Sequence, residues 1–130
     1  MSDVRTTIPD PIPERATRYV SFTVTDIDGV TPLANADIIL LSLVVTIFNE
    51  RTLAVVNSRS AQSVLNLNGG SVTSGGVVTL RLDPADTAIL GSTSEARVAS
   101  FVWTWGSPLI TGRHEVAFTV SDLALVPTPA

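Results

Sequence analysis

Apolar side chains that recur at every second residue are the feature that most constrains the fold of this chain. In residues 19–25, Val20, Phe22 and Val24 alternate with polar side chains, which is the pattern of a strand with one buried face. Three later segments also have strand character: 77–82, 96–105 and 113–121. Glycine, proline and asparagine mark turns between the segments. The pattern predicts strands that pack one face against a second sheet.

The longest apolar run, residues 38–48, reads IILLSLVVTIF. It is rich in β-branched side chains and has no helical polar stripe, so we expect a long strand that begins near Asp37. Both faces of this strand are apolar, which predicts a central position or a covered outer face. The run is shorter than the roughly 20 residues of a membrane helix, and no membrane partner is expected. The opening residues, MSDVRTT, also lack the pattern of a secretory signal.

The connections between the strands complete the predicted fold. Residues 53–56 are expected to form a hairpin with the long strand, and residues 57–76 to form short edge strands and turns. Asp83 can cap a helix and Pro84 suits the first helical position, so we predict one short helical turn near residues 84–90 that crosses between sheets. About seven strands in this order predict an all-β, antiparallel, immunoglobulin-like sandwich, with a small barrel or jelly roll as the alternative.

Residues 1–18 differ in composition from the body at residues 19–122. Three prolines fix φ and favour extended backbone before them, so this segment is predicted to be an extended arm that needs a partner surface. The apolar side chains among the prolines would be its anchors. The predicted partner-binding residues of the arm are Ile8, Pro9, Pro11, Ile12 and Pro13. Residues 123–130, with two further prolines, are predicted to be an extended tail.

Composition excludes several classes of function. The chain has no cysteine, so thiol catalysis, disulfides and cysteine-ligated metals are excluded. The eight basic residues, all arginine, face twelve carboxylates, and a nucleic-acid partner is not expected without a concentrated basic surface. The glycine pairs at residues 69–70 and 75–76 lack the lysine and the helix of a phosphate loop. We therefore predict no cofactor and no bound metal.

His114 is the only histidine, and we predict a structural or interface role for it. A hydrolase would need this ring to pair with a serine or threonine and with a carboxylate such as Glu115 or Asp122. Glu115 is the adjacent residue on the strand and points to the opposite face. No segment resembles a nucleophile elbow, so we do not expect an enzyme.

Asp26 and Asp28 precede Gly29 in an arrangement that resembles a fragment of a calcium loop. The remaining ligands of such a loop are missing. Turns also select aspartate and glycine for local hydrogen bonds and positive φ, and we predict a plain turn here.

Trp103 and Trp105 lie two residues apart and therefore on one face of a strand. Core packing is the predicted role of the pair, and Trp105 at the strand end is expected to be partly open. For that reason Trp105 is included among the predicted partner-binding residues. Stacking of the two rings on a sugar, together with Tyr19, is the alternative.

Four segments carry a resemblance to a known group of proteins: VLNLNGG from residue 64, SGGVVTLRLDPADTAIL from residue 74, ASFVWTWG from residue 99 and GRHEVAFTV from residue 112. Together they resemble small immunoglobulin-like structural proteins of tailed bacteriophages. The resemblance implies a virion protein without catalysis, present in many copies, whose partners are capsid, neck or tail subunits. It implies decoration or cementing of the capsid through the arm and a sheet face. A neck or tail protein and a carbohydrate-binding host-attachment module are the alternatives.

Overall fold

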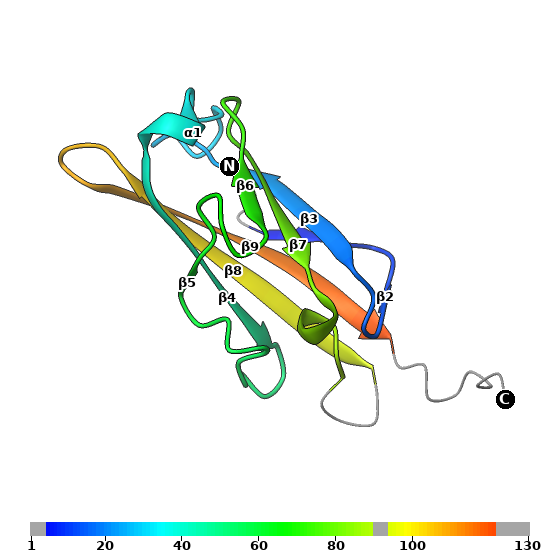
Figure 1. The fold of residues 1–130 in the computed structure, drawn as a ribbon. Coiled ribbons are helices and arrows are strands. Elements are labelled where there is room, and N and C mark those ends of the chain that lie inside the picture. Colours follow the sequence, from blue (N-terminus) through cyan, green and yellow to red (C-terminus); the bar gives the residue numbers. More distant parts are fainter. Residues whose placement is uncertain (1–4, 90–93, 122–130) are drawn as a thin grey trace, which may run out of the picture.

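The computed structural model describes residues 5–89 and 94–121, which form two packed β-sheets (Figure 1). The larger sheet has the order β1-β9-β8-β4-β5, with β2 also paired to β9, and the smaller sheet has the order β3-β7-β6. The strands are β1 (Arg5–Thr7), β2 (Ile12–Pro13), β3 (Arg18–Thr23), β4 (Leu40–Asn49), β5 (Gln62–Ser63), β6 (Gly70–Val72), β7 (Val77–Leu82), β8 (Glu95–Trp105) and β9 (Ile110–Ser121). The helical elements are α1 (Ala36–Ile39) and the 3-10 turn η1 (Pro84–Asp86).

This arrangement confirms the predicted sandwich. In the constant-type immunoglobulin fold an antiparallel sheet of four strands packs face to face on a sheet of three. Here one layer contains β3, β7 and β6, and the other contains β9, β8 and β4. Within the described residues the chain changes sheets four times: between β2 and β3, between β3 and β4, between β5 and β6, and between β7 and β8, where η1 lies. The predicted helical crossover is therefore confirmed, although η1 is shorter than residues 84–90 and residues 90–93 lie outside the described part.

The core lies between the sheets and is built by the alternation seen in the sequence. From β3 and β4, Val20, Leu43 and Ile47 are among the side chains that point inward and are buried. The neighbouring strands β8 and β9 contribute one continuous buried row: Ala99, Phe101, Trp103, Trp105, Val116, Phe118 and Val120. In the described part of the chain, no helix has the length and apolar character to cross a bilayer.

The strand predicted at residues 38–48 begins later than expected. Ile38 and Ile39 belong to α1, where both backbone N–H groups donate to the carbonyl of Asn35. Asn35 has a left-handed φ of 58°, which turns the chain before β4 begins at Leu40. The inner face of β4 is buried, whereas its outer face is half-buried except at Leu41, which is exposed. Sequence periodicity could not separate this helical turn from the strand, because the residues of both elements are apolar.

The hairpin predicted at residues 53–56 is formed only in part: the N–H of Asn49 donates to the carbonyl of Ala54, and the N–H of Val56 donates to that of Ile47. Val55 makes one isolated bridge with Phe48, and the short strand β5 is the partner that pairs with β4. Leu53 has a left-handed φ of 65°, which interrupts extended geometry at the start of this segment.

The prediction that residues 1–18 form an arm apart from the sandwich is wrong for the described residues. β1 pairs in parallel with β9 at Glu115, and β2 does so at Val120, so the segment forms the edge of the larger sheet (Figure 1). Ile12 is only 3% exposed, and Ile8 packs against the core. The physical reason is that β9 would otherwise be an open sheet edge, which the arm covers. Residues 1–4 and 122–130, including the predicted tail, lie outside the described residues.

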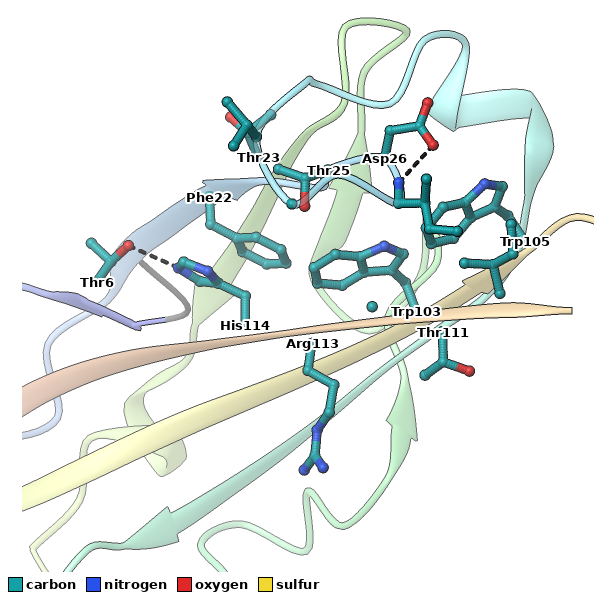
Figure 2. A pocket seen from close by; sticks show the side chains of 15 residues that line it. Thr6, Phe22, Thr23, Thr25, Asp26, Trp103, Trp105, Thr111, Arg113 and His114 are labelled. Atoms are coloured by element: carbon teal, nitrogen blue, oxygen red, sulfur yellow. Dashed lines mark hydrogen bonds between the residues drawn. The ribbon is translucent and has the colours of Figure 1, made fainter. Parts of the chain in front are cut away.

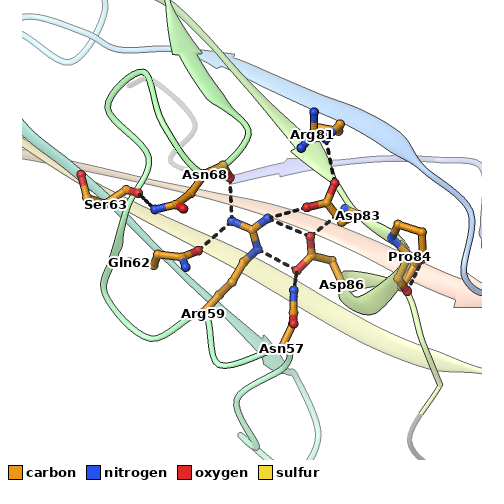
Figure 3. Close-up of polar contacts among 10 residues, drawn as sticks. Asn57, Arg59, Gln62, Ser63, Asn68, Arg81, Asp83, Pro84 and Asp86 are labelled. Atoms are coloured by element: carbon orange, nitrogen blue, oxygen red, sulfur yellow. Dashed lines mark hydrogen bonds and ion pairs between the residues drawn. The ribbon is translucent and has the colours of Figure 1, made fainter.

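A buried polar cluster ties η1 to the loop before β5 (Figure 3). The Asp86 carboxylate is fully buried and accepts hydrogen bonds from Arg59 at 2.7 and 3.0 Å, from Asn57 at 2.9 Å and from the backbone N–H of Asp83 at 2.7 Å. The guanidinium of Arg97, also buried, donates to the carbonyl of Asp86 at 2.6 Å. Because a buried charge is costly without partners, this cluster stabilises the fold only while it is complete.

Candidate binding site at the loop end of the sandwich

Two loops lie together at one end of the sandwich. Leu40, at the start of β4, pairs with Trp105, at the end of β8, so the β3–β4 loop with α1 and the β8–β9 hairpin share this end (Figure 1). A bridge between Thr25 and Pro32 shapes the first loop into a narrow hairpin.

Exposed apolar side chains are concentrated at this end. Among the described residues, six of the eleven exposed large apolar side chains lie here, and we call them the loop-end patch: Ile27, Val30, Ile38, Ile39, Leu41 and Leu109. Ile27 and Ile38 are each 78% exposed. Single exposed apolar residues need no explanation, but a group of them at one end indicates a surface that binds another molecule.

A pocket of about 780 Å³ adjoins the loop-end patch, and Ile27 and Val30 line part of it. Its other walls come from β3, β8, β9 and β1, as Figure 2 shows. The aromatic lining residues are Phe22, Trp103, Trp105 and His114. Hydroxyl groups of Thr6 and Thr25 are also near. Asp26 and Arg113 also line the pocket, so its surface is about equally polar and apolar.

Trp103 lies against the backbone of β9 at Gly112, its register partner. A Cβ atom at position 112 would lie 2.3 Å from Cε2 of the indole, so only glycine leaves room for the ring. Trp103 is 2% exposed, and its indole N–H makes no hydrogen bond within the described residues. Sequence reasoning placed Trp103 in the core, which is confirmed, but it did not identify Gly112 as the residue that makes space for it.

Trp105 is less open than expected, with an exposed fraction of 7%. It lines the pocket but offers little of its ring to a partner. Since both tryptophans are buried, neither presents an open face on which a sugar could stack. Tyr19 is 69% exposed on β3 and is not among the residues that line this pocket.

His114 is held by two contacts in the pocket wall. Its ring stacks on Phe22 with centroids 4.9 Å apart and planes 7° apart, and Nε2 lies 2.8 Å from Oγ1 of Thr6. Glu115 points to the opposite face, where its carboxylate accepts hydrogen bonds from Arg5. The group adjacent in sequence therefore does not orient the imidazole as the carboxylate of a catalytic triad does. The contacts support the predicted structural role.

Burial should make stability depend on pH through His114. Burial lowers the pKa of this imidazole from its usual value of 6.5, with Glu115 opposing more weakly. Between the two pKa values the unfolded chain binds more protons, so the free energy of unfolding should fall as the pH drops below about 6.5. The melting temperature should therefore fall more between pH 7.5 and pH 5.5 for the natural chain than for His114→Gln. An equal decrease in both would contradict this prediction.

Asp26 and Asp28 form the predicted plain turn. Asp28 Oδ1 accepts from the backbone N–H groups of Val30 at 2.9 Å and Thr31 at 2.8 Å. A hydrogen bond from the Thr31 hydroxyl is the main cause of the lowered pKa of Asp28. Across residues 5–89 and 94–121, no three histidine or acidic side chains are grouped as metal ligands.

The structure does not bring the predicted partner-binding residues together. Trp105 lies at the loop end, whereas Ile12 and Pro13 pair near the other end of β9. Pro9 and Pro11 are exposed between β1 and β2. Sequence reasoning missed the loop-end patch, although isoleucine and leucine in turn-rich segments were a signal for it.

Searches among protein-family models, curated proteins and solved structures found no match to this chain.

Proposed function

We propose that this protein is a non-enzymatic structural component of a tailed-bacteriophage virion that binds a neighbouring virion subunit through the loop-end patch. The concentration of exposed apolar side chains at one end of the sandwich is the observation that carries this proposal. Such a surface lowers the solubility of the protein unless a partner covers it. A virion is proposed as the assembly because four segments of the sequence resemble structural proteins of tailed bacteriophages. Capsid decoration is the first choice, and a place in the neck or tail is the alternative.

The presence of many copies on one particle explains how a weak contact can hold the protein in such an assembly. A patch on one end of a small sandwich buries limited area, so each contact by itself is weak. Many copies on a symmetric particle bind side by side, and a chain held by more than one contact gains avidity. This role needs a folded scaffold and an exposed apolar end, both of which the described residues provide. It needs no catalytic group.

Replacing Ile27 and Leu109 together by serine should lower incorporation of the full chain into purified particles at least about tenfold, because both side chains would lose apolar contact area. Incorporation is measured by quantitative mass spectrometry of density-banded virions from lysates that contain the chain. Both positions are exposed, at 78% and 62%, so folding should be retained, and circular dichroism checks this.

Leu53→Ser is the matched control, since Leu53 is 70% exposed beyond the opposite end of β4. It should be incorporated as well as the natural chain. Equal incorporation of the folded double variant would show that the loop-end patch is not the attachment surface. Absence of the natural chain from purified particles would contradict the virion role itself.

A further inference from the structure

The edge of β9 holds the N-terminal segment through contacts that a second copy could supply equally well. Arg5 to Thr7 pair with Glu115 to Ala117, the backbone N–H of Ile8 donates to Ala117 at 2.9 Å, and Ile12 is buried beside Val120. Arg5 adds ion pairs with Glu50 at 3.0 Å and Glu115 at 3.1 Å. We call residues 5–13 the edge arm. Its strand partner is β9 of the larger sheet, whereas the chain continues into β3 of the smaller sheet.

A short turn, residues 14–17, connects the edge arm to β3 and serves as the hinge. Arg15 has a left-handed φ of 61°, a conformation that side chains with a Cβ rarely adopt. The turn is closed by hydrogen bonds of 3.1 Å from the N–H of Arg15 to Thr87 and from that of Ala16 to Pro13. A short connection under backbone strain favours exchange of the connected segment between copies, because opening the hinge releases the strain.

Three prolines keep the edge arm extended whether or not it is bound. Pro9 and Pro11 are exposed and Pro13 lies in β2. Proline fixes φ, so a detached arm retains much of the conformation that it needs on β9 and loses little conformational entropy when it binds again. The arm is therefore preorganised for either its own β9 or that of another copy.

We propose that the edge arm exchanges between copies of this chain, so that residues 5–13 of one copy occupy the β9 edge of a second copy. Every contact of the arm is then preserved, and only the hinge at residues 14–17 changes. Mutual exchange gives a closed dimer, and one-directional exchange gives a chain of subunits. The inference concerns self-association and does not depend on the proposed virion function.

Two chains with one cysteine each test the exchange, because the natural sequence contains none. Thr7 and Ala117 are register partners, and adjacent strands place Cα atoms within the range of a disulfide. A Thr7→Cys chain and an Ala117→Cys chain are mixed, warmed to open the arms, cooled and oxidised. In the exchanged form they should give a covalent heterodimer on a non-reducing gel.

The mixture of Thr7→Cys with Thr119→Cys is the matched control, since Thr119 lies on the same strand but out of register and is more exposed. Random collisions would link this pair at least as well. We expect roughly tenfold more heterodimer from the in-register pair, because the bound arm raises the effective concentration of the two thiols. If no heterodimer forms, while one chain with both Thr7→Cys and Ala117→Cys closes its disulfide internally, the exchange is contradicted.

Variants of the hinge give an independent readout. Arg15→Gly removes the strain at positive φ and should lower the fraction of dimer several-fold, whereas Arg15→Val increases the strain and should raise it. The fractions are measured by size-exclusion chromatography with light scattering after refolding at matched concentrations. The same dimer fraction in both variants would show that hinge strain does not drive exchange.

Discussion

Replacing Asp86 by alanine should lower the free energy of unfolding by about 3 to 5 kcal/mol, the usual cost of breaking a buried ion pair. The variant leaves the guanidinium of Arg59, only 3% exposed, without its main carboxylate partner. It also removes the acceptor for the backbone N–H of Asp83 that closes η1. Since small domains are stable by roughly 5 to 15 kcal/mol, this one change should leave the fold marginal. Urea unfolding followed by tryptophan fluorescence measures it.

Asp83→Ala provides the comparison in the same cluster. The side chain of Asp83 is 37% exposed, and its contact with Arg59 is long, at 3.5 Å. Its loss should cost about 1 kcal/mol, a typical value for a helix cap. If Asp86→Ala proves as mild as Asp83→Ala, the buried cluster contributes much less than its geometry indicates. Joint replacement of Arg59 by methionine and Asp86 by alanine should recover part of the loss, because no unpaired charge then stays buried.

Local pattern in the sequence was sufficient to predict the sandwich. Strands such as β3 and β7 follow directly from alternation, and the DP dipeptide at residues 83–84 marked the crossover turn. The same reasoning placed Trp103 in the core. These features depend on residues close in sequence, where side-chain period and turn chemistry act on the backbone directly.

The features that were not predicted depend on residues far apart in the chain. Arg59 and Asp86 are 27 positions apart, and nothing in the local pattern of either residue indicates a buried pair. The fit between Trp103 and Gly112 depends on the register of two strands. Proline in residues 1–18 predicted extended backbone correctly, but an extended segment fits its own sheet edge as well as a foreign one. Only the position of β9 at the sheet edge shows that the segment binds its own sheet and not that of another protein.

Removing residues 1–13 should destabilise the sandwich and increase its self-association. The shortened chain loses the buried side chain of Ile12, worth about 1.5 to 3 kcal/mol, and the backbone pairing of β1 and β2 with β9. It also exposes β9 as an open edge, which favours pairing between chains.

Urea unfolding and size-exclusion chromatography measure both effects of the truncation. Ile12→Ala in the full chain should reproduce part of the destabilisation, about 2 kcal/mol or more, without opening the edge. Pro11→Ala, at an exposed position between β1 and β2, is the control and should change stability by less than about 1 kcal/mol. A shortened chain as stable and as monomeric as the natural one would mean that residues 1–13 contribute nothing to the sandwich, and that the segment serves a surface other than β9.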